Sequence, residues 1–121
     1  MNKRILIIDD NEQDRKGMVL ALRRDGYVEI AEAAGEDEGL VLARACRPDV
    51  VIVDVVLPAN DGFDVCQAIK KIDGLAPKVI VITGHLEAVK AAKARVSGAD
   101  EIIEKQAGFK NIHPTIQRLA G

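Results

Sequence analysis

The stretch Asp49-Val-Val-Ile-Val-Asp54-Val-Val-Leu-Pro58 contains a short apolar run that ends at a carboxylate. Within it, residues 50–53 are all Val or Ile, with no alternation of polar and apolar side chains. Such a run is typical of a parallel strand that is buried on both faces of a sheet. A charged side chain is seldom buried without a partner, so the position of Asp54 suggests that a cation stands opposite it.

Similar apolar runs recur along the chain and alternate with longer helical patterns. This alternation predicts an α/β fold, in which a doubly wound, five-stranded parallel sheet is flanked by five helices. The expected strands are 4–8, 28–31, 50–53, 78–82 and 101–103. The expected helices run from a cap at Asp10 or Asn11 to just before Gly26, and then over 36–47, 61–71, 86–97 and 111–119.

Length and charge exclude several classes of protein. The chain has 121 residues, which suffices for one domain, and its net charge of −2 offers no basic surface for nucleic acid. No apolar segment approaches the length of a membrane span. The apolar run near the N-terminus stops at Asp9, too early for a signal peptide. We therefore expect a cytoplasmic protein with no direct contact to nucleic acid or membrane.

Chemically reactive side chains follow four of the expected strands, always at the same end. In a doubly wound sheet, ligands bind outside the carboxyl ends of the strands. Taken singly, Asp10 is explained as a helix cap, Thr83 as a turn residue and Lys105 as a solvated surface charge. Their joint placement instead predicts one functional site, which comprises Asp9, Asp10, Asp54, Thr83 and Lys105.

Three carboxylates at close quarters repel one another unless a cation joins them. Mg²⁺ prefers oxygen ligands, uses one or two carboxylates and keeps water molecules that a phosphate can replace. A lysine on the other side of the site supplies a compact positive charge for the same phosphate. The residues thus predict a Mg²⁺-dependent phosphate site.

With these residues, the chain resembles a known family, the receiver domain of two-component response regulators, of the chemotaxis-response-regulator type. The resemblance extends over nearly the whole chain and implies a flavodoxin-like sheet with strand order 2-1-3-4-5. It also implies one receiver domain over residues 1–121, with no output domain in this chain. The matching segments are 7–11 (IIDDN), 54–58 (DVVLP), 61–63 (DGF), 81–84 (VITG) and 98–101 (GADE) leading to Lys105.

The resemblance implies a role for each candidate residue. Asp54 is similar to the phosphoacceptor, Thr83 to the switch hydroxyl, and Lys105 to the lysine that pairs with the phosphoryl group. Mg²⁺ is expected on Asp10, Asp54 and the backbone carbonyl of Val56, with Asp9 acting on the metal through water. The implied partner is a sensor histidine kinase or a histidine phosphotransfer protein, whose phosphohistidine supplies the phosphoryl group. The downstream target is not indicated.

Two residues near Lys105 depart from the family pattern. Gln106 stands where the family usually has proline after the lysine, which favours a trans peptide bond because a cis bond before another residue costs about 2.5–4 kcal/mol. Ile102 stands where the family commonly has Tyr or Phe, so coupling of an aromatic ring to Thr83 is not expected here.

Other functions remain alternatives. The two departures favour a phosphorylation-independent interaction domain with the receiver fold, whereas the complete set of site residues favours the phosphorylated switch. A haloacid-dehalogenase-like phosphatase needs a second Asp two positions after the nucleophile, where this chain has Val56. No glycine-rich nucleotide motif follows the first strand. We therefore expect a signalling domain that catalyses only its own phosphotransfer and dephosphorylation, not an enzyme.

Overall fold

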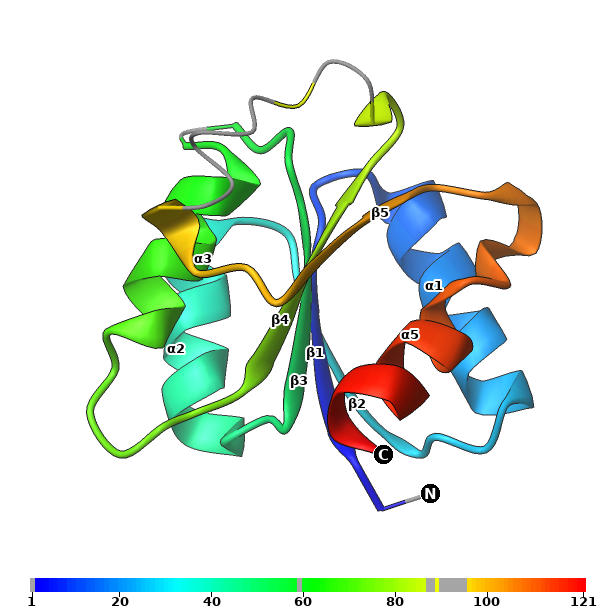
Figure 1. Ribbon diagram of the computed structural model, residues 1–121, viewed down its shortest axis with the longest axis horizontal. Coiled ribbons are helices and arrows are strands. Elements are labelled where there is room, and N and C mark those ends of the chain that lie inside the picture. Colours follow the sequence, from blue (N-terminus) through cyan, green and yellow to red (C-terminus); the bar gives the residue numbers. More distant parts are fainter. Residues whose placement is uncertain (1, 59, 87–88, 90–95) are drawn as a thin grey trace.

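The computed structural model describes residues 2–58, 60–86, 89 and 96–121, and its sheet has the predicted topology (Figure 1). Five parallel strands are ordered β2-β1-β3-β4-β5, so the chain reverses direction of winding beside β1. The strands are β1 (Arg4–Ile8), β2 (Glu29–Ala33), β3 (Val50–Asp54), β4 (Lys78–Thr83) and β5 (Glu101–Glu104).

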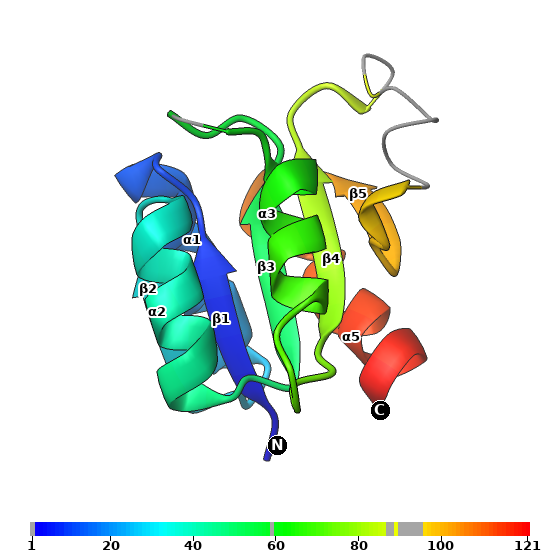
Figure 2. The ribbon, with the colours of Figure 1, turned by 90° about the vertical axis from the view of Figure 1, so that its left-hand side faces the viewer.

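Helices cover both faces of this sheet, as predicted. Helices α1 and α5 lie on one face of the sheet and α2 and α3 on the other, as the edge-on view of Figure 1 shows. In Figure 2 the sheet is seen face-on, with α2 and α3 in front of it. The bounds are α1 (Glu12–Arg24), α2 (Glu36–Cys46), α3 (Gly62–Lys70) and α5 (Ile112–Ala120), with a short 3₁₀ helix, η2 (Ala107–Phe109), before α5. The helix predicted over 86–97 falls largely outside the described residues.

The continuous apolar runs have a simple explanation in the two cores. Along β1, Ile5 and Ile7 enter the core under α1 and α5, whereas Leu6 and Ile8 enter the core under α2 and α3. Both faces of an inner strand therefore need apolar side chains, and polar alternation disappears. The two edge strands, β2 and β5, are more exposed. The predicted bounds of β2 were wrong: Val28 is exposed, and pairing continues to Ala33.

Capping side chains set where the helices nearest the site begin. The Asn11 side chain accepts a hydrogen bond from the Asp14 backbone N–H, so Asn11, not Asp10, caps α1. Asp61 caps α3 by accepting from the N–H groups of Phe63 and Asp64. Because Asn11 caps the helix, the Asp10 carboxylate is left available at the end of the sheet.

No helix in the described part of the chain is long and apolar enough to cross a membrane.

The start of β5 is fixed by a polar contact to α3. The Asp100 carboxylate accepts from Lys70 Nζ at 2.6 Å and from the Val79 N–H at 2.8 Å. Burial opposes ionisation of Asp100, but these two hydrogen bonds and the positive charges of Lys70 and Lys78 lower its pKa below the ordinary value. The contact therefore positions the strand that leads to Lys105.

We predict that Asp100→Asn lowers the unfolding free energy by about 1 kcal/mol at pH 7, since the ion pair is lost and one neutral acceptor remains. A lowered pKa means that the ionised carboxylate stabilises the fold above the ordinary value of 3.8. The difference between the two proteins should shrink as the pH falls below that value. Urea unfolding from pH 3 to pH 7 measures it, and a pH-independent difference would contradict this assignment.

Candidate functional site

The register of the sheet brings the predicted residues to one edge, namely the end of the sheet at which the parallel strands terminate. Ile8 pairs with Val53, Asp54 pairs with Ile82, and Thr83 pairs with Glu104, so four strands end at nearly the same level. The residues that carry polar chemistry lie in or directly after these last pairs. This edge is the upper end of the sheet in Figure 1.

Three carboxylates meet there as the sequence predicts. One oxygen from each of Asp9, Asp10 and Asp54 lies within 4.8 Å of the others. Asp9 and Asp54 are buried, with 0% and 6% of their surface exposed, whereas Asp10 is exposed. The cluster is thus open to solvent on the Asp10 side and closed beneath Asp9.

Lys105 supplies the cation that the position of Asp54 in the sequence predicts. Its Nζ atom donates to Asp54 Oδ2 at 2.6 Å, to Asp14 Oδ2 at 2.7 Å and to Asp9 Oδ2 at 3.0 Å. The Lys105 side chain is 16% exposed. Replacement of the family proline by Gln106 does not move the ammonium away: the peptide bonds of the described residues are all trans, and Lys105 still reaches Asp54.

Backbone geometry holds the buried carboxylates in place. Asp54 Oδ1 accepts from the Val56 N–H at 2.9 Å, and Asp9 Oδ1 accepts from the Asn11 N–H at 2.8 Å. Gly62 approaches the strand end so closely that a Cβ atom there would lie 2.1 Å from the Asp54 carbonyl oxygen. Only glycine fits at this position, which explains the Asp61-Gly62 pair in the sequence.

The electrostatics of the site favour neutralisation of the negative charge of its carboxylates. Burial raises the pKa of Asp9 to about 6, and the negative charge of Asp54 adds to this, although the Asn11 N–H and Lys105 act in the opposite direction. Burial alone would lower the pKa of Lys105, but its hydrogen bonds to Asp14, Asp54 and Asp9 raise that pKa above the ordinary value. The ammonium therefore stays charged, and the cluster can accept further positive charge.

Thr83 lies at the end of β4, where it was predicted, and is 4% exposed. Its hydroxyl oxygen accepts from the His85 N–H at 3.1 Å, and its carbonyl accepts from the Lys105 N–H at 2.8 Å. Thr83 is thus tied through the backbone to the lysine that contacts Asp54. Ile102 is half-buried and packs against the core that α2 and α3 cover.

A cavity of about 270 Å³ opens over the cluster and is lined by Asp10, Asp54, Val56 and Lys105, among others. Its donors are carboxylate oxygens, the hard ligands that Mg²⁺ prefers, and Asp10 keeps one side exposed to water. The donor set therefore fits Mg²⁺. The Val56 N–H donates to Asp54, whereas the expected role of the Val56 carbonyl as a Mg²⁺ ligand stays a prediction.

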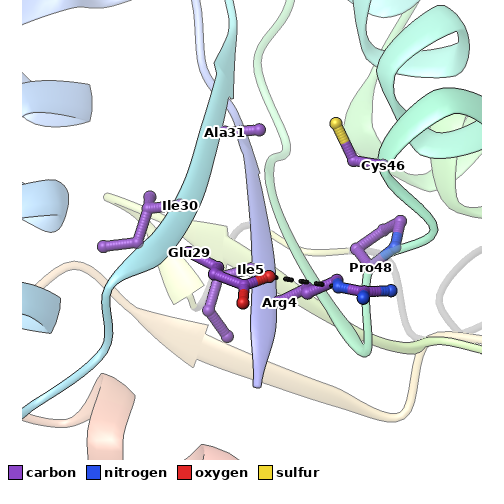
Figure 3. A pocket seen from close by; sticks show the side chains of 7 residues that line it. All are labelled: Arg4, Ile5, Glu29, Ile30, Ala31, Cys46 and Pro48. Atoms are coloured by element: carbon purple, nitrogen blue, oxygen red, sulfur yellow. Dashed lines mark hydrogen bonds and ion pairs between the residues drawn. The ribbon is translucent and has the colours of Figure 1, made fainter. Parts of the chain in front are cut away.

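A second cavity, of about 320 Å³, lies beside β1, β2 and the C-terminal end of α2 (Figure 3). The two charged side chains that line this cavity form an ion pair with each other, since Arg4 Nε lies 3.1 Å from Glu29 Oε2. Cys46 and Ala31 contribute to an otherwise mostly apolar wall. No convergent set of carboxylates is found there among the described residues, so the chemistry, not the size, identifies the first cavity as the site.

Asp14 and Arg15 both reach the site from α1, and neither was predicted from the sequence. Asp14 contacts Lys105, and Arg15 donates to the Asp9 carbonyl at 2.8 Å while pairing with Glu32. An acidic residue in the first turn of a helix is usually explained by the helix dipole, which concealed the role of Asp14. Its position one turn after the Asp9–Asp10 pair was the available signal.

Comparisons with known proteins identify the family of the chain. The model of the family described as the response regulator receiver domain matches residues 5–117. The chain therefore belongs to the receiver domains of response regulators, the phosphorylation-switched signalling domains of two-component systems.

Among curated relatives, the transcriptional regulatory protein AfsQ1 of Streptomyces coelicolor is 37% identical over 84% of this chain and 44% of its own length. The chain spans about half the length of the curated relatives it matches. Among solved structures, chemotaxis response regulator CheY4 of Vibrio cholerae has a TM-score of 0.88 at 26% identity and covers 98% of this chain and 99% of its own. Response regulator TrrA of Thermotoga maritima, solved with Mg²⁺-BeF, has a TM-score of 0.85 at 28% identity, covering 97% and 98%.

We predict that Asp9→Asn raises the unfolding free energy in chelator-treated solution at pH 7 by on the order of 1–3 kcal/mol. A raised pKa means that Asp9 stabilises the fold when protonated, below 3.8, and that this contribution is lost as the pH rises through about 6. Denaturant unfolding at pH 4 and pH 7 tests this. A gain that is equal at both pH values, or a loss at pH 7, would contradict it.

Proposed function

We propose that Asp54 is the phosphoacceptor of this receiver domain and that Mg²⁺ bound at Asp9, Asp10, Asp54 and the Val56 carbonyl is required for the transfer. The contact of Lys105 Nζ with Asp54 Oδ2 at 2.6 Å, beside two further carboxylates, is the observation that carries the proposal. This contact supports the proposal because it holds a positive charge beside the carboxylate that would accept the phosphoryl group.

In the reaction, an oxygen of the ionised Asp54 forms a bond to phosphorus while the phosphorus–nitrogen bond of a phosphohistidine breaks. The electron pair of that bond leaves with the imidazole, and an acyl phosphate remains on Asp54. A carboxylate is a weak nucleophile, so positioning and charge stabilisation must supply the catalysis. Mg²⁺ supplies charge neutralisation at the phosphoryl oxygens.

The residues of the chain have separate tasks in this scheme. The Val56 N–H holds one oxygen of Asp54, and Lys105 pairs with the other until the phosphoryl group arrives. Lys105 then donates to a phosphoryl oxygen. The Thr83 hydroxyl, now an acceptor for the His85 N–H, is free to donate its own hydrogen to the phosphoryl group and so shifts the loop after β4 toward the active form.

The partner that supplies the phosphoryl group is proposed to be a sensor histidine kinase or a histidine phosphotransfer protein in the cytoplasm. Curated relatives include DNA-binding response regulators about twice the length of this chain, such as MtrA of Mycobacterium tuberculosis. A receiver of this kind acts either alone or as the switch of a longer regulator, so its output is a separate question from its chemistry.

Intact mass spectrometry after incubation with acetyl phosphate tests the proposal. We expect the wild-type chain to gain one phosphoryl group in the presence of Mg²⁺ and none after chelation. Asp54→Asn should gain none under either condition, because the side-chain amide is not a nucleophile.

Asp64→Asn is a matched control, since Asp64 is a carboxylate in the first turn of α3 and is not a member of the carboxylate cluster. It should be phosphorylated like the wild type. Incorporation into Asp54→Asn, or incorporation that does not depend on Mg²⁺, would overturn the assignment. Absence of incorporation into a folded wild-type chain would favour a phosphorylation-independent interaction domain.

A further inference from the structure

Asp14 is a fourth carboxylate at the site, and it reaches Lys105 from a different element than the other three. It lies in the first turn of α1, where its backbone N–H is bonded by the Asn11 side chain. Its carboxylate extends to Lys105 Nζ at 2.7 Å and is 35% exposed. The ion pair thus joins the start of α1 to the residue that follows β5.

The contact uses one of the three donors of the ammonium. A lysine has three N–H donors, and here the three partners are Asp9, Asp14 and Asp54. Asp9 and Asp54 also belong to the carboxylate cluster that fits Mg²⁺, whereas Asp14 is not a member of that cluster. Among the described residues, Asp14 is therefore the partner of Lys105 that neither belongs to the proposed metal site nor accepts the phosphoryl group.

A second contact joins the segment after β5 to α1. Gly17 lies three residues after Asp14, on the same face of α1. A Cβ atom at Gly17 would lie 2.8 Å from Cε2 of Phe109, so the Phe109 ring packs directly on the helix. Phe109 has a φ of 50°, which is uncommon for a residue other than glycine, and it follows Gly108, whose φ is 69°.

We propose that Asp14 is a positioning residue for phosphoryl transfer: it holds the Lys105 ammonium over Asp54 from the side of α1. The inference rests on the function proposed above. With Asp14 removed, Lys105 keeps only partners that turn to the metal and the phosphoryl group during the reaction. Its ammonium then has no fixed partner that orients it.

The first experiment measures the rate of phosphorylation by acetyl phosphate with Mg²⁺, a small donor that needs no protein partner. Asp14→Ala should slow the reaction about three- to tenfold, because a charge-assisted hydrogen bond is lost. Asp14→Asn, which retains an oxygen acceptor without the charge, should fall between Asp14→Ala and the wild type. Glu12→Ala, which removes an exposed carboxylate from the same helical turn, should react at the wild-type rate.

The same substitution is then made in a Lys105→Met background. If Asp14 acts through Lys105, Asp14→Ala has no further effect there, and the double-mutant cycle is strongly non-additive. A purely structural or long-range charge effect would slow both backgrounds equally. Such additivity would overturn the proposal, as would an unchanged or faster rate for Asp14→Ala in the wild-type background.

A readout without turnover separates this inference from the proposed function. The ¹⁵N-labelled ammonium of Lys105, assigned by its absence in Lys105→Met, should give a shifted and slowly exchanging NMR signal in the metal-free chain. Asp14→Ala should move it toward the signals of the exposed lysines, and Glu12→Ala should not. A phosphorylated wild type with no effect of Asp14→Ala refutes only the role of Asp14, whereas an unphosphorylated wild type refutes the proposed function and, with it, this role.

Discussion

The ion pairs of Lys105 are the interaction on which the end of the sheet depends. One ammonium contacts carboxylates that follow β1, end β3 and begin α1, and thus joins segments that are far apart in the sequence. Without that cation, buried Asp9 and Asp54 would face each other as unpaired charges, which a protein interior does not tolerate. At the site, several carboxylates are consequently grouped around the Lys105 ammonium.

This balance connects the fold to the chemistry. The inner strands are apolar on both faces, so charge can be placed only at their ends, and parallel strands bring those ends to one edge. The same backbone turn that ends β3 holds Asp54 through the Val56 N–H and requires Gly62 beside it. The two cores thus surround the buried strands with apolar packing, whereas the carboxylates of Asp9, Asp10 and Asp54 gather where the strands end.

Much of this arrangement could be predicted from the residues. Uninterrupted Val and Ile in 50–53 indicated a buried parallel strand, and the order of Asp9, Asp10, Asp54, Thr83 and Lys105 along the chain indicated a shared edge. The bounds of β2 were missed because an edge strand lacks the apolar run of an inner one. Asp14 was missed because a first-turn acid is expected in any helix, and only the three-dimensional contact with Lys105 distinguishes it.

The most direct test of the account is the unfolding free energy of Lys105→Met, measured by urea denaturation with a chelator and again with saturating Mg²⁺. If Lys105 neutralises the carboxylates, its loss should destabilise the metal-free chain by about 1–3 kcal/mol. Mg²⁺ should then stabilise the variant more than it stabilises the wild type, because the metal takes over the missing charge. A metal-free variant as stable as the wild type, or an equal response of both proteins to Mg²⁺, would contradict the central role of Lys105.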